Sequence, residues 1–410
     1  MGGEGYMPGR ALVTGISGFV GPILARGLLD LGYEVYGLIR RRAKGSLPEM
    51  IDEGIKLIEG DVTDLTSVLS AIDKSEPDVI FHLAAQSFVP RSFEQPLETF
   101  RVNTIGTLNI LEAVRLKDLD CKIIFAGSSE EYGLQIASER HYKAALEKYK
   151  VIYPEPKRIP ELPIDEYNPL RPLSPYAASK VHGDFLMRTY YYSYGIKTVV
   201  SRAFNHEGSG RGHHFVTSTI VRQSVQLKLG EADKIPIGNV NAFRDWSHVE
   251  DIVEGYILLS EKGVPGEVYV LGSMRTNSVL SYILLTLEQL GYEVKEIEAI
   301  RGEKRVRDPL ERDYGEAFGL KFEKTKVDRL MLDEGLGFEL SDRGIKVKTD
   351  KGEITIEFDP NRFRPTDVPI LLSNPKKAME NLGFKPTKKL IDIIKDQINY
   401  YLDPYNRKSI

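Results

Sequence analysis

Three spaced glycines directly after the first apolar segment constrain this chain more than any other feature. Residues 11–14 are predicted to form a strand and residues 18–31 a helix, and Gly15, Gly18 and Gly21 occupy the junction. Glycines at such a junction let the backbone turn tightly and approach a pyrophosphate, which sits at the N-terminus of the following helix. The spacing also fits a plain glycine-rich turn, but its place at the first strand-to-helix junction favours a dinucleotide site.

The rest of the first half alternates short apolar runs with amphipathic stretches. Further strands are predicted at residues 34–39, 56–59, 79–83, 122–126 and 197–202, and long helices at 99–115 and 175–194. This alternation predicts an α/β fold with a Rossmann-type, doubly wound parallel sheet. Ligands of such sheets bind at the carboxyl ends of the strands, so side chains that follow each strand are the first candidates for a site.

The pattern changes near residue 205. Helices are predicted at residues 215–229, 249–259, 277–290, 374–382 and 390–402, and a β-hairpin is predicted around Asp350-Lys351-Gly352. We therefore expect a cofactor-binding domain over residues 1–204 and a smaller, mixed α/β lobe over residues 205–410, with the two interleaved. Two charged stretches, about 136–163 and 295–341, are interpreted as insertions.

Composition narrows the partners. The net charge of −4 over 410 residues provides no global basic field, which argues against nucleic acid. No apolar run approaches the roughly 18 residues of a membrane span, and the N-terminus lacks the apolar core of a signal peptide, so we expect a cytoplasmic protein without membrane contact. The single cysteine, Cys121, begins an apolar run and is predicted to be a buried structural thiol. His213 and His214 have no third ligand in view, so no metal site is predicted.

The end of the second predicted strand indicates which dinucleotide binds. NAD enzymes place an acidic residue there for the ribose 2′-hydroxyl, whereas this strand runs into Arg40, Arg41 and Arg42. Guanidinium groups can fork onto a 2′-phosphate. We therefore predict NADP, with Arg40 and Arg41 on the phosphate; the alternative is a solvated basic loop.

A second group of residues carries chemistry. Tyr176 and Lys180 stand four residues apart on a predicted helix and therefore on one face. A nearby ammonium lowers the pKa of a phenol, which would let Tyr176 act as a base near neutral pH. Ser128, Ser129 and Glu130 follow the fifth predicted strand. Tyr-x-x-x-Lys spacing also arises by chance, but beside the glycine loop and this serine it predicts a catalytic site.

This set of motifs resembles the extended short-chain dehydrogenase/reductases, and finer motifs are similar to those of the GDP-mannose 4,6-dehydratases. The finer motifs are Ala84-Ala85-Gln86-Ser87, Ser92-Phe93-Glu94-Gln95-Pro96, Phe204-Asn205-His206-Glu207, Arg211-Gly212, Phe215-Val216-Thr217, Arg244-Asp245-Trp246 and Arg364-Pro365-Thr366-Asp367-Val368. The resemblance covers roughly residues 10–135, 164–292 and 350–400. Residues 128–133 and 171–176 instead resemble the related GDP-4-keto-6-deoxymannose reductases, so the reaction stays open between the two.

The resemblance implies a role for each matching residue. Tyr176 would take the proton of the C4 hydroxyl that Ser128 holds, Glu130 would remove the C5 proton, and the C6 hydroxyl would leave as water. The implied cofactor contacts are Gly15, Ser17, Gly18, Phe19, Val20, Gly21, Asp61, Val62, Leu83, Ala84, Ala85, Tyr176, Lys180, His206 and Arg211. The implied contacts of the substrate, a GDP-linked hexose, are Ser87, Ser129, Asn205, Arg244 and Arg364.

Neighbouring carboxylates are assigned by backbone geometry. If the chain after the fifth strand is extended, Ser128 and Glu130 share one face, and Ser129 and Glu131 share the other. We therefore predict that Glu130 reaches the substrate and that Glu131→Gln keeps activity within a few-fold.

Several rival readings stay open. A reductase needs no C5 base, a 4-epimerase usually retains NAD, which Arg40 to Arg42 disfavour, and an idle NADP-binding regulator would not need Ser128, Tyr176 and Lys180 intact. The resemblance also implies pairing through the helices at 99–115 and 175–194, hence a homodimer or homotetramer.

Overall fold

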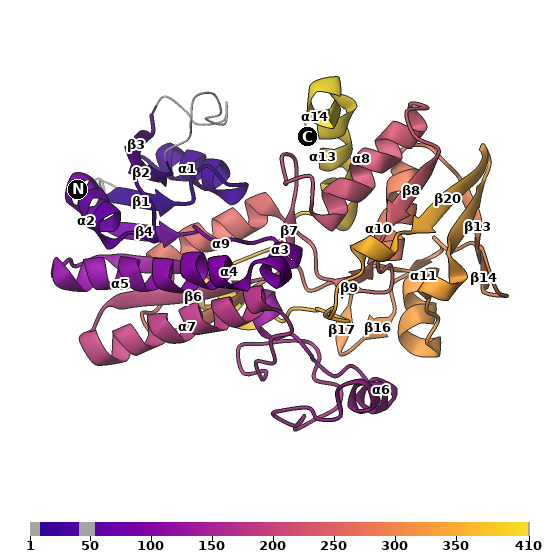
Figure 1. The fold of residues 1–410 in the computed structure, drawn as a ribbon, viewed down its shortest axis with the longest axis horizontal. Coiled ribbons are helices and arrows are strands. Elements are labelled where there is room, and N and C mark those ends of the chain that lie inside the picture. Colours follow the sequence, from indigo (N-terminus) through magenta and orange to yellow (C-terminus); the bar gives the residue numbers. More distant parts are fainter. Residues whose placement is uncertain (1–8, 41–53, 409–410) are drawn as a thin grey trace, which may run out of the picture.

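The computed structural model describes residues 9–40 and 54–408 (Figure 1). The first lobe is built on a seven-stranded parallel sheet in the order β11-β6-β5-β4-β1-β2-β3. The strands are β1 (Arg10–Thr14), β2 (Glu34–Ile39), β3 (Lys56–Glu59), β4 (Val79–His82), β5 (Lys122–Ala126), β6 (Lys197–Ala203) and β11 (Val268–Leu271). The predicted doubly wound α/β fold is confirmed.

Helices cover both faces of this sheet, which is why its central strands are near-continuous apolar runs. One face is packed by α1 (Val20–Asp30), α9 (Val249–Lys262) and α12 (Lys376–Leu382), and the other by α2 (Leu65–Ser75), α5 (Gly106–Leu116) and α7 (Pro175–Tyr194). Cys121 is buried against the second group, as predicted, and burial raises the pKa of its thiol to about 12.

The predicted helix at 99–115 is not one regular helix. It consists of α4 (Pro96–Phe100), a π-helical stretch (Arg101–Ile105) and α5. Within the π-helical stretch, Asn103 donates from Nδ2 to the hydroxyl of Ser179 at 2.9 Å and to a backbone carbonyl of the loop after β4 at 3.1 Å. The widened turn thus places a buried amide between two segments that border the site described below.

The second lobe is built on a five-stranded mixed sheet in the order β14-β13-β19-β20-β8. Its strands are β8 (Lys234–Ile237), β13 (Val294–Ala299), β14 (Arg305–Arg307), β19 (Gly344–Thr349) and β20 (Gly352–Phe358), and its main helices are α8 (Val216–Lys228), α10 (Val279–Gln289) and α13 (Leu390–Leu402). The predicted hairpin is present as β19 and β20. Strand β11 and helix α9 follow residue 205 in sequence, but β11 is part of the seven-stranded sheet and α9 packs against it. The chain therefore passes between the two lobes more than once (Figure 1).

The stretch at 295–341, interpreted from its charge as an insertion, contributes the interior strand β13 and the edge strand β14 to the lobe's sheet. Its charges are cross-strand partners: Glu296 binds Arg305 at 2.6 Å and Lys348 at 3.0 Å. The rest of the stretch carries β15 (Arg312–Asp313), β16 (Glu316–Ala317), β17 (Leu320–Lys321), β18 (Lys324–Thr325), α11 (Lys326–Arg329), a π-helical turn (Leu330–Glu334) and a 3-10 turn (Leu340–Asp342).

The stretch at 136–163 holds α6 (Glu139–Tyr149) over a small apolar cluster of its own. It is fixed to the chain before α7 by a buried two-pronged ion pair, in which Arg171 binds Glu161 at 2.7 and 2.8 Å. The remaining elements are α3 (Val89–Glu94), η2 (Ser129–Glu131), β7 (His206–Glu207), β9 (Phe243–Arg244), β10 (Ser247–His248), β12 (Asn277–Ser278), η5 (Pro360–Arg362) and α14 (Pro404–Lys408).

Residues 9–40 and 54–408 lack two kinds of feature. No helix there is both long enough and apolar enough to cross a membrane. No group of three or more histidine, cysteine, aspartate or glutamate side chains there is arranged to hold a metal ion.

Candidate functional site

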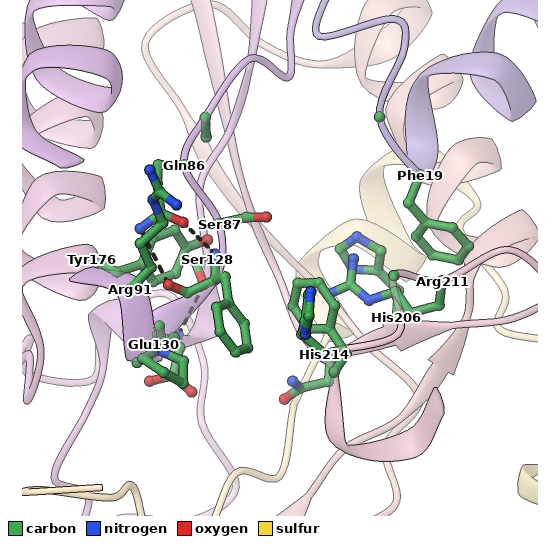
Figure 2. A pocket seen from close by; sticks show the side chains of 18 of the residues that line it. Phe19, Gln86, Ser87, Arg91, Ser128, Glu130, Tyr176, His206, Arg211 and His214 are labelled. Atoms are coloured by element: carbon green, nitrogen blue, oxygen red, sulfur yellow. Dashed lines mark hydrogen bonds between the residues drawn. The ribbon is translucent and has the colours of Figure 1, made fainter. Parts of the chain in front are cut away.

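A cleft of about 1340 Å³ runs between the carboxyl edge of the seven-stranded sheet and the second lobe (Figure 2). Every residue predicted for the site lines it except Arg41, which lies outside the described residues. The lining residues that were predicted are Gly15, Ser17, Gly18, Phe19, Val20, Gly21, Arg40, Asp61, Val62, Leu83, Ala84, Ala85, Ser87, Ser128, Ser129, Glu130, Tyr176, Lys180, Asn205, His206, Arg211, Arg244 and Arg364.

The three glycines of the first loop have different structural reasons. Gly15 has φ +71°, and a Cβ there would lie 2.8 Å from the amide nitrogen of Ala84. A Cβ on Gly21 would lie 2.4 Å from the carbonyl oxygen of Ile16, inside the loop-to-helix packing. Gly18 faces the open cleft, with only the Gly15 carbonyl within 4 Å, at 3.1 Å. Gly15 and Gly21 therefore permit the turn, and Gly18 leaves room for a ligand at the N-terminus of α1.

The neighbouring strand ends are held by short polar contacts. The carboxylate of Asp61 accepts from the amide and hydroxyl of Thr63, at 2.8 and 2.9 Å. The Thr14 hydroxyl accepts from the Ala84 amide at 3.2 Å and contacts the His82 ring at 2.8 Å. These contacts fix the ends of β1, β3 and β4 beside the glycine loop, where the cofactor end of the cleft was predicted.

The segment after β5 is a 3-10 turn, η2, so the prediction of extended backbone there is wrong. Ser128 caps the turn: its hydroxyl accepts from the Glu130 amide at 3.2 Å. Glu130 lines the cleft, whereas Glu131 points inward and is fully buried. The two carboxylates therefore do face opposite ways, but the capped turn separates them rather than strand alternation.

Tyr176 and Lys180 lie in the first turns of α7, whose N-terminus is capped by Ser174. Burial lowers the pKa of Lys180 to about 8, and its ammonium donates to the Ala126 carbonyl at 2.7 Å. Burial raises the pKa of Tyr176, and its hydrogen bond with Ser128 offsets only part of that rise. The cation that lowers the Tyr176 pKa is Arg211 rather than the predicted Lys180, and desolvation outweighs it, so the phenol is protonated at neutral pH.

Figure 2 shows Ser87, Ser128, Glu130 and Tyr176 on one side of the cleft and Phe19, His206, Arg211 and His214 on the other. The Arg211 guanidinium lies over the ring of Phe215, 3.5 Å from its centroid, and burial lowers the pKa of His206 to about 4, so this imidazole is neutral. The side-chain oxygen of Asn205 is buried and has no hydrogen-bond partner among the described residues. This wall thus offers a cation and an unused acceptor to a ligand.

Arginines mark the far end of the cleft. Arg244 donates to the carbonyls of Phe243 and Val368 and to the carboxylate of Asp367, at 2.9, 2.6 and 2.9 Å. Arg364 lies 3.8 Å from the same carboxylate and is more exposed. Asp367 therefore orients both guanidinium groups.

Sequence reasoning missed several residues of the cleft. It quoted Asp367 within a motif but assigned it no role, and it did not single out Phe88, Arg91 or Arg222, which also line the cleft. Arg222 could have been found, since it follows Phe215 by seven residues and so lies two helical turns along the same face. Phe88 and Arg91 follow β4 in a loop and a short helix, where no periodicity marks them.

Asp245 and Trp246 pack beneath this end of the cleft. Both are buried, and the Asp245 carboxylate accepts from the amides of Ser273 and Ser373 at 2.8 and 3.0 Å. They support the arginine wall without lining it.

The chain is similar to known families and to known proteins over most of its length. Residues 11–272 match the NAD dependent epimerase/dehydratase family, and residues 334–397 match the GDP-mannose 4,6 dehydratase family. The chain is 30% identical to a GDP-mannose 4,6-dehydratase of Yersinia enterocolitica, over 92% of this chain and 89% of that protein. It is 31% identical to a GDP-mannose 4,6-dehydratase of Vibrio cholerae, over 95% of this chain and 92% of that protein.

Solved structures share the fold. RMD from Pseudomonas aeruginosa complexed with NADPH superposes with a TM-score of 0.64 at 21% identity, over 96% of this chain and 98% of that chain. The UDP-glucose 4-epimerase of Thermus thermophilus in complex with NAD superposes with a TM-score of 0.66 at 23% identity, over 96% of this chain and 99% of that chain.

Proposed function

The chain belongs to the NAD dependent epimerase/dehydratase family and to its GDP-mannose 4,6-dehydratase members, and on that premise we propose that it converts GDP-mannose to GDP-4-keto-6-deoxymannose with NADP. The observation that carries the proposal is the position of Glu130. Its carboxylate lines the cleft two residues after Ser128 and on the same wall as Tyr176 (Figure 2). A hydroxyl, a phenol and a carboxylate side by side are the set that oxidation at C4 followed by elimination across C5 and C6 requires.

The cleft fits a dinucleotide on two observations. Gly18 leaves the N-terminus of α1 open to a pyrophosphate, where any side chain would project into the cleft. Arg40, with no carboxylate beside it in the sequence from residue 38 to 42, lines the cleft at the end of β2 and supports NADP over NAD. The glycine loop and Asp61 would hold the adenosine side, with Tyr176, Lys180, His206 and Arg211 toward the reacting end. When bound, the nicotinamide would accept hydride from C4 and return it to C6.

The residues of the chain handle the protons. Ser128 hydrogen-bonds the substrate's O4, and Tyr176 takes the O4 proton once its own has left. Because burial holds the Tyr176 phenol protonated at rest, the ammonium of Lys180, one helical turn on, is needed to favour the phenolate. The C4 ketone then acidifies the C5 proton, which Glu130 removes and passes to the C6 oxygen, so that the C6 hydroxyl departs as water. Arg244 and Arg364 bind the diphosphate through charge-assisted hydrogen bonds.

Glu130 also separates this reaction from the rivals on the same scaffold. A 4-keto reductase or a 4-epimerase uses Ser128, Tyr176 and Lys180 but takes no proton from C5. Purified protein supplied with GDP-mannose and no reductant should therefore release a 4-keto sugar. In deuterated water the product of the wild-type enzyme should carry deuterium at C5. The Glu130→Gln variant should oxidise C4 but should neither exchange the C5 proton nor release water.

Two results would overturn the proposal that the protein is a dehydratase. The first is product only when NADPH is supplied with a 4-keto sugar, and the second is a wild-type product without deuterium at C5. Glu147→Gln, on an exposed part of α6 outside the cleft, is the matched control and should behave as the wild type.

We also propose that the protein assembles through α4, the π-helical stretch, α5 and α7 into a homodimer or a homotetramer of such dimers. Large apolar side chains stand exposed on these helices: Leu97, Ile105, Leu116, Phe185, Tyr192 and Tyr194. Burying such side chains against a second copy removes apolar area from water. Light scattering at micromolar concentration tests this, and a monomer would reject it.

A further inference from the structure

Glu131 stands next to the proposed C5 base but does not reach the cleft. Its side chain is fully buried, and its Oε1 accepts the backbone N–H of Ser128 at 2.7 Å. The Ser128 hydroxyl caps the same turn from its other end, so the two residues form a reciprocal capping box. The carboxylate of Glu131 is therefore the group that fixes the backbone from which both Ser128 and Glu130 project.

The other carboxylate oxygen of Glu131 faces a buried guanidinium. Arg202 Nε, on β6, lies 3.5 Å from Glu131 Oε2 and 2.8 Å from a carboxylate oxygen of Asp184. Asp184 follows Lys180 by four residues on α7, so it stands on the same face as that lysine. Arg202 thus links the turn that carries Glu130 to the helix that carries Tyr176 and Lys180.

We propose that Glu131 is a positioning residue, which holds Ser128 and Glu130 in reacting orientation by connecting the Ser128 amide to Arg202 and, through it, to the helix of Tyr176 and Lys180. This inference rests on the proposed function. It assigns to Glu131 no contact with substrate. It does explain why two adjacent carboxylates follow β5 although only one lines the cleft.

The charges around Glu131 give the proposal a pH signature. The groups that face it are Arg202 on β6, Asp184, Lys180 and Tyr176 on α7, Tyr132 directly after the turn, and the Ser128 amide. Burial and Asp184 raise the pKa of Glu131 well above its usual range, against Arg202 and the amide. As Glu131 ionises it supports the charge of Lys180, whose pKa burial lowers to about 8. Removing the carboxylate should therefore let Lys180 lose its proton at lower pH.

Two variants of the full-length protein test the proposal in the GDP-mannose assay. Glu131→Leu keeps the side chain's bulk but leaves the Ser128 amide without an acceptor, and we expect kcat to fall about tenfold or more with KM changed little. Glu131→Gln keeps an acceptor, and we expect it to restore kcat to within a few-fold of wild type at pH 7. Its alkaline limb of kcat should lie at lower pH than that of the wild type.

A matched control separates positioning from general destabilisation. Asp251 is another buried carboxylate that accepts backbone amides, those of Thr387 and Lys388 at 3.1 Å each, and it does not line the cleft. Asp251→Leu should lower the Tm as Glu131→Leu does, while the folded fraction keeps its kcat. Calorimetry and NADP titration accompany each assay.

The outcomes are distinct. Wild-type kcat in folded Glu131→Leu, or an alkaline limb unchanged in Glu131→Gln, would overturn the positioning role. If Glu131→Leu does not fold, the pH profile of Glu131→Gln still decides. A wild-type protein that does not dehydrate GDP-mannose would overturn the proposed function instead, since that result does not depend on either variant.

Discussion

The two ends of the cleft are built from different parts of the chain. At Gly15, Gly18 and Gly21 the surface is backbone, folded so closely that a Cβ on the first or third glycine would meet another backbone atom. At Arg244 and Arg364 the surface is side chain, oriented by the carboxylate of Asp367. One end comes from a single short loop, and the other is gathered from segments more than one hundred residues apart.

The two ends should therefore respond differently to substitution. A backbone surface has no spare volume, so one added methyl group either strains the loop or fills the space of the ligand. A side-chain surface can lose one guanidinium and keep its shape, so binding should weaken in steps. The turn η2 and the first turns of α7 stand between the two ends. Substitutions there should change turnover without changing binding at either end.

Of the substitutions considered, Tyr176→Phe should produce the largest effect on kcat. It should also show that turnover can be lost without loss of binding. The variant keeps the ring in its buried site but removes the hydroxyl that exchanges the O4 proton, so kcat should fall about 10²-fold or more. Binding at both ends should persist, because neither the glycine loop nor the arginines change. Single-turnover assays with NADP and GDP-mannose titrations measure this. Near-normal turnover would mean that the proton takes another route.

The same contrast explains what could be predicted from the sequence. The glycine loop, the strands of the first sheet and the Tyr176–Lys180 pair are local patterns, and the structure places them together as expected. Buried parallel strands are short apolar runs, which are visible without knowledge of their partners. The glycine motif fixes a turn by the conformations that only glycine adopts freely, so its place in the fold follows directly.

What the sequence could not supply depends on distant partners. Strand β13 looks like a charged insertion because its glutamates pair with Arg305 and Lys348 on neighbouring strands, which no local pattern reveals. The turn after β5 was expected to be extended, but the cap by Ser128 and the burial of Glu131 beside Arg202 select a 3-10 turn. Asp367 was not predicted because its role is to orient Arg244 and Arg364 through its carboxylate, and Arg244 lies 123 positions away in the sequence.

Alanine substitutions in the glycine loop should separate two functions of one backbone surface. A Cβ on Gly18 faces the open cleft, so Gly18→Ala should weaken NADP binding about tenfold or more while the free energy of unfolding changes by less than about 1 kcal/mol. Gly21→Ala should instead lower the free energy of unfolding by about 1–3 kcal/mol, because its Cβ would lie 2.4 Å from the Ile16 carbonyl oxygen. Cofactor titration and urea unfolding measure both. Equal behaviour of the two variants would break the distinction.

Arg364→Gln should test whether the far end responds in steps. The variant removes one cation that is partly exposed and leaves the Arg244–Asp367 pair in place. A hydrogen bond to a charged group contributes about 1.5–3 kcal/mol, and the lower end applies at this partly exposed site, so KM for GDP-mannose should rise about tenfold with kcat nearly constant. Steady-state kinetics measure this, with the Tm as a check on folding. A fall in kcat at constant KM would place Arg364 in the reacting machinery.

The smallest effect should come from Arg40, which lines the cleft at the end of β2 and which we propose favours NADP over NAD. In the proposed complex the glycine loop would bind the pyrophosphate that both cofactors share, so it would not select between them. Arg40 is exposed at the rim, where solvent screens a charge-assisted hydrogen bond to the 2′-phosphate. Arg40→Ala should therefore reduce an expected preference for NADP of about tenfold by a few-fold and leave NAD affinity unchanged. The Arg40→Ala/Arg41→Ala double variant should reduce it further. Fluorescence titration with both cofactors would measure the ratio; an unchanged ratio in the double variant would mean that the loop after β2 does not select the cofactor.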